Sequence, residues 1–173
     1  MHAFIEMGVG ALSDADQQAV AHYCLEFLEA ARHGELDDLR LIGGHSQLRT
    51  LIDFKTLVDP ESATSPLMLA SANGWADCMH FLLDEIRVSV DHANKSGNTA
   101  LHWAALNGHA ECVQLLLARG ACVEAKNCFG QTPFDEALGR DQKDCCEMIA
   151  RRECELMDDD EEEVEGASFV FED

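Results

Sequence analysis

The chain has 173 residues, enough for one compact domain, and its hydrophobic content of 47% is that of a folded protein. Its 33 acidic and 12 basic residues give a formal net charge of -21, which disfavours nucleic acid and anionic membranes and favours basic partners. No apolar run approaches the roughly 18–20 residues that span a bilayer, and the first residues do not resemble a signal peptide. With eight cysteines, the sequence therefore predicts a cytoplasmic protein with free thiols, and leaves a nuclear location open.

The sequence predicts a series of helix pairs in chain order. Ser13 and Asp16 form a capping-type start for a helix that runs to about residue 32, and a partner helix is expected at 35–42. Residues 43–60 lengthen the first spacing, so we expect an extra helical turn or a long finger there. Three further helix pairs are expected near residues 66–85, 100–118 and 133–152.

Acidic residues concentrate at the C-terminal end. From Glu153 to Asp173 there are 11 acidic residues and no basic ones, so this segment carries more than half of the net charge. The block Asp158–Glu163 holds six like charges in a row, whose repulsion favours disorder. We therefore predict a disordered acidic tail at 153–173, a folded domain at 13–152 that ends with Arg151 and Arg152 in its last helical turn, and a flexible segment at 1–12.

An internal repeat with a period near 33 organises the middle of the chain. An offset of 33 superimposes one set of residues: Gly97 with Gly130, Thr99 with Thr132, and Cys112 with Cys145. An offset of 34 in the other direction superimposes a second set: Leu101 with Leu67, Gly108 with Gly74, and Cys112 with Cys78. A weaker copy places Ala30-Ala31 and Gly34 where Ala104-Ala105 and Gly108 stand. This pattern resembles the ankyrin repeat, a β-turn followed by two antiparallel helices, and implies an all-α solenoid of about four helix pairs with irregular caps.

Each conspicuous residue of the repeat has a physical reason. Gly97 suits a hairpin finger, where positive φ is easily reached only by glycine. Thr99 can cap the next helix through its hydroxyl group, and the resemblance implies that it shares hydrogen bonds with His102. Gly108 lets the chain turn between the two helices of a pair. In the last repeat Asp141 stands where this glycine belongs, as in an irregular capping unit.

The sequence shows no chemistry of a catalytic or metal site. Cys78, Cys112 and Cys145 occupy a repeat position at which the ankyrin consensus has a buried valine, and free cysteine packs as a small hydrophobe. The cysteines and histidines lack zinc-site spacing, and no nucleophile elbow, phosphate loop or H-E-x-x-H motif is present. We therefore expect no enzyme activity, no metal and no cofactor.

With enzyme, metal and cofactor functions set aside, the sequence favours recognition of a protein partner. Ankyrin solenoids bind partners on a concave surface made of finger tips and first helices. Trp103 and Phe129 are the aromatic candidates for anchors, although Trp103 is equally suited to packing between repeats. The candidate partner-binding residues are Glu61, Ser62, Thr64, Asn73, Lys95, Ser96, Asn98, Trp103, Leu106, Asn107, Phe129, Gln131 and Arg140, with Asp158, Asp159, Asp160, Glu161, Glu162 and Glu163 in the tail.

A narrower resemblance rests on the segment 94–108, on Asn127, Phe129 and Gly130, and on the acidic run after the last helix. These features are similar to those of fungal ankyrin-repeat chaperones that escort the third protein of the small ribosomal subunit. The resemblance implies a monomer that holds a basic ribosomal protein during ribosome biogenesis. The alternatives are a generic ankyrin scaffold or inhibitor of a regulatory protein and, more remotely, an enzyme-associated subunit. The apolar segment Ser168–Phe171 has no counterpart in the resemblance.

Overall fold

A computed structural model describes residues 13–161, and every regular element in that range is helical. The elements are α2 (Asp14–His33), α3 (Leu36–Gly44), α4 (Leu48–Leu51), α5 (Pro66–Asn73), α6 (Ala76–Phe81), the π-helical turn η1 (Leu82–Ile86), α7 (Ala100–Asn107), α8 (Ala110–Ala118), α9 (Pro133–Gly139) and α10 (Lys143–Glu161).

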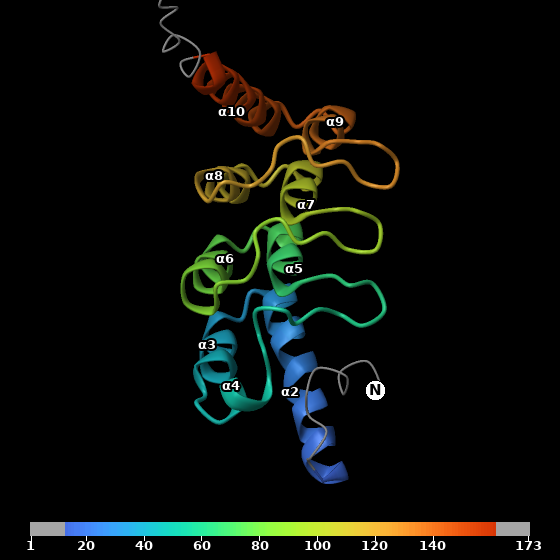
Figure 1. The fold of residues 1–173 in the computed structure, drawn as a ribbon, viewed down its shortest axis with the longest axis vertical. Helices are drawn as coiled ribbons and strands as arrows, with labels where there is room; N and C mark the ends of the chain where they lie inside the picture. Colours follow the sequence, from blue (N-terminus) through green and yellow to red (C-terminus); the bar gives the residue numbers. More distant parts are fainter. Residues whose placement is uncertain (1–12, 162–173) are drawn as a thin grey trace, which may run out of the picture.

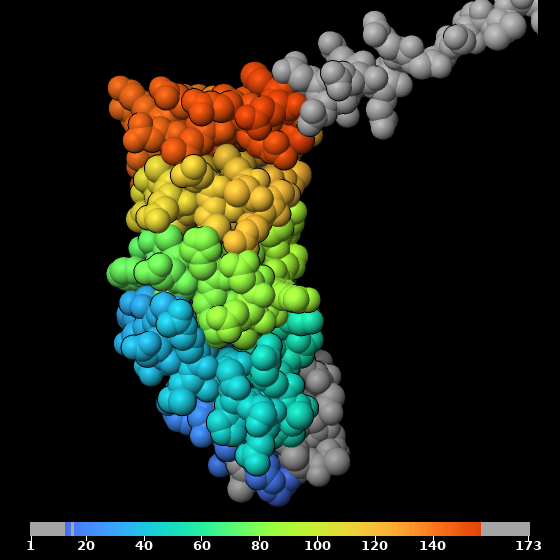
Figure 2. Space-filling model, turned by 90° about the vertical axis from the view of Figure 1, so that its left-hand side faces the viewer, coloured from blue at the N-terminus to red at the C-terminus, as the bar shows by residue number. Residues whose placement is uncertain are grey.

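The helices form two rows (Figure 1). The first row contains α2, α5, α7 and α9, whose neighbours pack directly on one another. The second row contains α3 with α4, α6, α8 and α10, and three long loops project from the opposite side of the first row. Figure 2 shows the same stack as successive bands of sequence along one axis. The predicted all-α solenoid of four helix pairs is confirmed over the described residues.

The first-row helices begin at side-chain caps. The Oγ of Ser13 accepts a hydrogen bond from the Asp16 amide at 3.3 Å, as the sequence predicted, and Ser65 caps α5 in the same way. At α9 the pairing is reciprocal, because the Asp135 amide donates to Thr132 Oγ1 at 3.2 Å while the Thr132 amide donates to Asp135 Oδ2 at 2.9 Å. These bonds satisfy amides at helix starts that have no partner within the helix.

Small residues let the first-row helices approach one another. Ala70, Ala104 and Ala137 are each fully buried at corresponding places in α5, α7 and α9. Larger side chains, such as Leu101 and Leu116, fill the space between the two rows and are also buried. The core is therefore a continuous apolar layer along the stack, renewed by each repeat.

Each turn between the helices of a pair is covered by a side chain of the next repeat. Trp75 lies over Gly34 and donates from Nε1 to the Arg32 carbonyl at 2.9 Å, and a Cβ at Gly34 would lie 2.5 Å from its ring. His109 covers Gly74 in the same manner. These glycines are thus required both by a positive φ and by a neighbour that leaves no room for a side chain.

The last repeat shows why a glycine is dispensable there. Asp141 has a φ of 56° at the equivalent turn, so it adopts the left-handed conformation that glycine adopts in the earlier repeats. No later repeat packs over this turn in the described part of the chain, so its side chain has space. The replacement of the turn glycine that the sequence indicated is therefore accommodated by the left-handed conformation of Asp141.

Residues 43–60 contain both the extra helical turn and the long loop that the sequence offered as alternatives. They form the short helix α4 and then a loop whose Ile52, Phe54 and Leu57 side chains are buried. The rings of Phe54 and Phe27 lie 4.7 Å apart between centroids, which attaches the loop to α2. The long first spacing thus adds apolar cover to the N-terminal end of the stack.

The π-helical turn η1 explains why one repeat is a residue longer than the next. From Ala76 to the left-handed Arg87 the second-row helix has one residue more than the equivalent span from Ala110 to Gly120. A π-helical turn takes up a single extra residue without shifting the rest of the helix. The offsets of 34 and 33 in the sequence therefore differ by this inserted residue.

The last helix is longer than the sequence indicated. α10 continues to Glu161, nine residues beyond the expected end at 152, so Arg151 and Arg152 lie within the helix and not at its C-terminal turn. Glu, Leu and Met are good helix formers, and no glycine or proline interrupts this stretch. The first part of the segment predicted as a disordered tail is thus helical, and residues 162–173 lie outside the described range.

The three repeated cysteines are core residues, as predicted. Cys78, Cys112 and Cys145 are each about 1% exposed. Burial raises the pKa of all three thiols, that of Cys112 to about 11, so these groups are protonated and unreactive at neutral pH. Among the described residues no cluster of His, Cys, Asp or Glu side chains has the geometry to hold a metal ion.

We predict that Cys112→Val changes the free energy of unfolding by less than about 1.5 kcal/mol, because the two side chains are close in volume. Cys112→Ser should cost more, since it leaves a hydroxyl group in an apolar site. Chemical denaturation of both variants measures the difference. Equal losses for valine and serine would contradict the assignment of this thiol to the core.

Candidate partner-binding surface

The three long loops end in hairpins, here called fingers, with tips at residues 59–64, 94–98 and 127–131. Each hairpin is closed by a backbone hydrogen bond, as between the Asn127 amide and the Gln131 carbonyl at 3.0 Å. Inside the tip, Oδ1 of Asn127 accepts from the amides of Phe129 and Gln131, both at 3.0 Å. Asn94 accepts from two amides in the second finger in the same way. A side chain two to four residues earlier thus fixes each tip.

Neighbouring fingers are joined edge to edge. The Lys95 amide donates to the Ser62 carbonyl at 3.0 Å, and the Cys128 amide donates to the Ser96 carbonyl at 2.9 Å. The buried Asn127 side chain adds a bond from Nδ2 to Oδ1 of Asn98 at 3.0 Å. Because each finger is bonded to the next, the finger tips form a row whose backbone is fixed before any partner arrives.

His102 connects the first helix of one repeat to the finger of the next. Its Nδ1 accepts from the Thr99 amide at 3.1 Å and lies 2.9 Å from Thr99 Oγ1, while Nε2 donates to the Gln131 carbonyl at 3.1 Å. An acceptor at Nδ1 and a donor at Nε2 define the neutral ring. Burial lowers the pKa of His102, which favours the same form. The structural role that the sequence gave to His102 is confirmed.

Several predicted binding residues have their polar atoms engaged in the scaffold. Ser62 and Thr64 bond to each other, and Ser62 also donates to Asp59. Nζ of Lys95 donates to two carbonyl groups of the first finger, including Glu61 O at 2.6 Å. Asn107 donates to the Ala72 carbonyl at 2.7 Å and therefore links two first-row helices. The polar atoms of these side chains therefore stabilise the surface through hydrogen bonds within the chain.

Other predicted residues leave their side chains exposed. Phe129 is 80% exposed at the tip of the third finger, which is unusual for a phenylalanine. The remaining predicted residues with exposed side chains are Glu61, Asn73, Lys95, Ser96, Asn107, Gln131 and Arg140. Asn98, Trp103 and Leu106 are partly buried.

Trp103, the second aromatic candidate, is partly buried. It packs against the core from α7, and its Nε1 is buried without a hydrogen-bond partner among the described residues. The contacts with the core fit packing between repeats, and the role of Trp103 as an anchor for a partner stays a prediction.

The predicted acidic residues divide at the end of α10. Asp158, Asp159, Asp160 and Glu161 belong to the last part of the helix, and Glu162 and Glu163 lie outside the described residues.

A hollow at the N-terminal end of the stack was not predicted from the sequence. It has a volume of about 660 Å³ and lies between α2 and the α3–α4 region. Tyr23 and Leu41, which are 37% and 70% exposed, line it together with the carboxylates of Glu26, Glu29, Glu35 and Asp38. Because these residues come from irregular parts of the repeat pattern, no periodicity marked them.

Together the stacked fingers, the first-row helices and the acidic ends define a repeat-built protein-interaction module. The family profile described as "Ankyrin repeats (3 copies)" matches residues 27–127 and 86–160. The chain therefore belongs to the ankyrin-repeat family, whose members are generally non-enzymatic modules that bind proteins.

Curated relatives share the repeats at moderate identity. The chain is 27% identical over 144 residues to a transient receptor potential cation channel subfamily A member 1 homolog of Caenorhabditis elegans, covering 83% of this chain and 11% of the relative. It is 37% identical over 95 residues to the ankyrin repeat and KH domain-containing protein mask of Drosophila melanogaster, covering 53% and 2%. It is 33% identical over 102 residues to protein phosphatase 1 regulatory subunit 12A of Rattus norvegicus, covering 57% and 9%.

The chain thus spans only a small part of the length of these relatives, and none of their three names refers to a ribosomal protein. In the described residues, no helix combines the length and the hydrophobicity needed to cross a membrane.

Gly97 and Gly130 form a matched pair that tests the packing of the fingers. Both have positive φ, at 76° and 75°, but a Cβ at Gly97 would lie 2.9 Å from the Asn127 Cα, whereas nothing lies within 4 Å of one at Gly130. We expect Gly130→Ala to cost about 1 kcal/mol for the backbone conformation alone. Gly97→Ala should cost roughly 1 kcal/mol or more beyond that. Thermal and chemical denaturation measure both, and equal costs would mean that the fingers are not packed edge to edge.

The neutral state of His102 predicts a pH dependence. Folding lowers the pKa of His102 from its usual value of 6.5, so the ring is harder to protonate in the folded protein than in the unfolded chain. The contribution of neutral His102 to the free energy of unfolding is therefore fully present above pH 6.5, and it falls as the pH drops toward the pKa of the folded protein. A His102→Gln variant keeps the charges that surround this position. They include Glu136, whose negative charge acts to raise the pKa of His102. The stability difference between wild type and variant should therefore shrink below pH 6.5. A difference that stays constant with pH would exclude a neutral buried His102.

Proposed function

We propose that this chain binds a basic client protein, and that the client is a small-subunit ribosomal protein held before its assembly. The observation that carries the proposal is the distribution of charge. Residues 13–161 hold 27 acidic residues, which is 33 less the six at the two ends of the chain, against all 12 basic ones. A free ribosomal protein is strongly basic, so an acidic partner would replace the RNA phosphates that it meets later.

In this proposal, binding is divided between the finger row and two acidic regions. The finger row offers fixed positions and the exposed Phe129 ring, which suit selective contact. The acidic end of α10 and the hollow between α2 and α3 offer negative charge at opposite ends of the stack. Exposed charge of this kind acts mainly on the association rate and on its salt dependence. The cytoplasm is the compartment in which we place this binding.

A second candidate is a scaffold or an inhibitor that binds a regulatory protein. It is favoured by the relative named as a regulatory subunit of protein phosphatase 1, which shares these repeats. In that case the acidic residues serve solubility, and the finger row alone carries the binding.

Two matched variants separate these functions. In the first, the block Asp158–Glu163 is changed to Asn and Gln, which keeps its length and removes its charge. In the second, Phe129 is changed to Ala. Each is tested for binding to the third protein of the small ribosomal subunit across a range of ionic strength, with a histone as an unrelated basic control.

We expect the neutral block to lower the association rate at low salt roughly tenfold or more and to flatten its salt dependence. Phe129→Ala should instead raise the dissociation rate and leave the salt dependence unchanged. Equal binding of the ribosomal protein by wild type and the neutral variant at every ionic strength would refute the electrostatic role. Equal affinity for the histone would reduce the chaperone to a nonspecific polyanion.

A further inference from the structure

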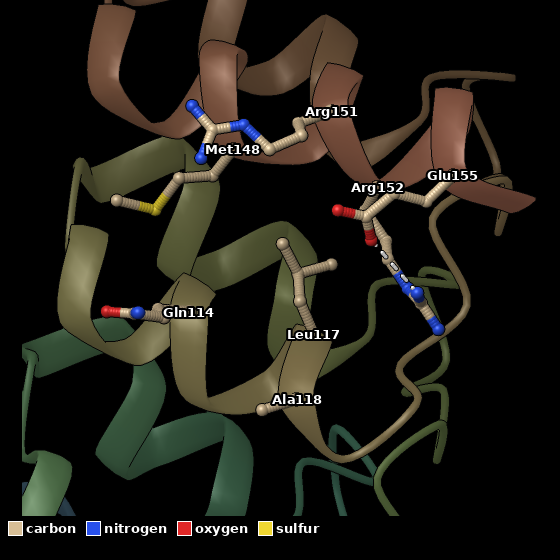
Figure 3. Close-up of a pocket in the computed structure, with 7 residues that line it drawn as sticks. All are labelled: Gln114, Leu117, Ala118, Met148, Arg151, Arg152 and Glu155. Atoms are coloured by element: carbon tan, nitrogen blue, oxygen red, sulfur yellow. Dashed lines mark hydrogen bonds and ion pairs between the residues drawn. The ribbon is translucent and has the colours of Figure 1, made fainter.

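The outer side of the last two repeats contains a groove that the proposed function does not use. It has a volume of about 420 Å³ and lies between α8 and α10. Figure 3 shows Leu117 pointing from α8 toward α10, with Met148 and Arg151 on one side and the Arg152–Glu155 pair on the other. The groove thus has an apolar floor and two guanidinium groups at its rim.

These arginines are distinctive in so acidic a chain. Arg152 donates to Glu155 at 3.1 Å, whereas the exposed Arg151 side chain makes no hydrogen bond or ion pair with the described residues. An apolar floor below guanidinium groups fits a segment that carries both aromatic rings and carboxylates, because the rings can pack on Arg and Met while the carboxylates pair with Arg.

The chain itself contains such a segment. The sequence ends in Ser168-Phe169-Val170-Phe171-Glu172-Asp173, in which two phenylalanines are followed at once by two acids. In an extended segment, residues two apart project to the same side, so both rings can face one surface. We propose that Phe169 and Phe171 of this same chain dock in the groove between α8 and α10, with Glu172 and Asp173 beside Arg151 and Arg152.

The length of the chain beyond α10 permits this contact. From Glu161 back to Met148 the helix covers 13 residues, or about 20 Å. From Glu161 forward to Phe169 there are eight residues, which reach up to about 28 Å when extended. Gly166 lies within this stretch and permits a reversal of direction. A tether this short keeps the effective concentration of the rings in the millimolar range, so even a weak contact is populated.

The Met148 methyl group provides a direct test in the full-length chain. Its ¹³C-methyl resonance, assigned with Met148→Leu, should show cross-relaxation with phenylalanine ring protons. In the double variant Phe169→Ser/Phe171→Ser this cross-relaxation should be lost and the Met148 resonance should shift, because the rings no longer pack on it. The buried Met79 methyl group should not move, which shows that the fold is intact.

Val164→Ser is the matched control, since it removes an apolar side chain from the same segment without touching the aromatic pair. It should leave the Met148 resonance in place. A Met148 resonance that is unaffected by the double variant would overturn the proposal. So would a shift that depends on protein concentration, because the groove would then be filled by a second copy of the chain. The test needs no client and is therefore independent of the proposed function.

Discussion

Close approach between consecutive repeats is the constraint on which the rest of the structure depends. Each finger lies directly against the next, and the covered turns at Gly34 and Gly74 leave no space for a Cβ. Each repeat therefore contacts only its neighbours, and stability accumulates from nearest-neighbour interfaces. Where no following repeat packs over the turn in the described range, the requirement disappears, as the left-handed Asp141 shows. The same contacts that stabilise the stack also align the finger tips into one surface.

That alignment fixes the backbone of the finger row. Asn127 and His102 use their polar atoms to fix backbone carbonyls and amides, so the row of tips is ordered before binding and little conformational entropy is lost when a partner arrives. Phe129 stands out among the candidates because it is a large apolar side chain that is 80% exposed. In the proposed function, selectivity comes from contacts such as those of the Phe129 ring, while the acidic residues act over a longer range.

The sequence predicted the structural features that recur in every repeat, and it did not predict the features that occur in one repeat alone. Gly97, Thr99 and Cys112 recur at a fixed offset because each interface makes the same demand on them, and so the helix pairs and buried thiols could be derived. The π-helical turn before Arg87 was only visible as an offset of 34 in place of 33, which does not say where the extra residue lies. The hollow beside Tyr23 and the groove beside Met148 arise from irregular first and last repeats, so no period marked them.

The extension of α10 was missed for a different reason, and this reason bears on binding. Like-charge repulsion in the block that begins at Asp158 favoured disorder, yet intrinsic helix propensity and the helix already formed by the last repeat carry the chain to Glu161. The helix consequently ends with acidic residues at the negative end of its dipole, and its last turn contains no basic residue. This arrangement is unfavourable in isolation, and positive charge from outside the chain would relieve it. Under the function proposed above, a basic client would therefore stabilise the end of α10 as it binds, and the cost of that acidic end in the free protein would become part of the affinity for the client.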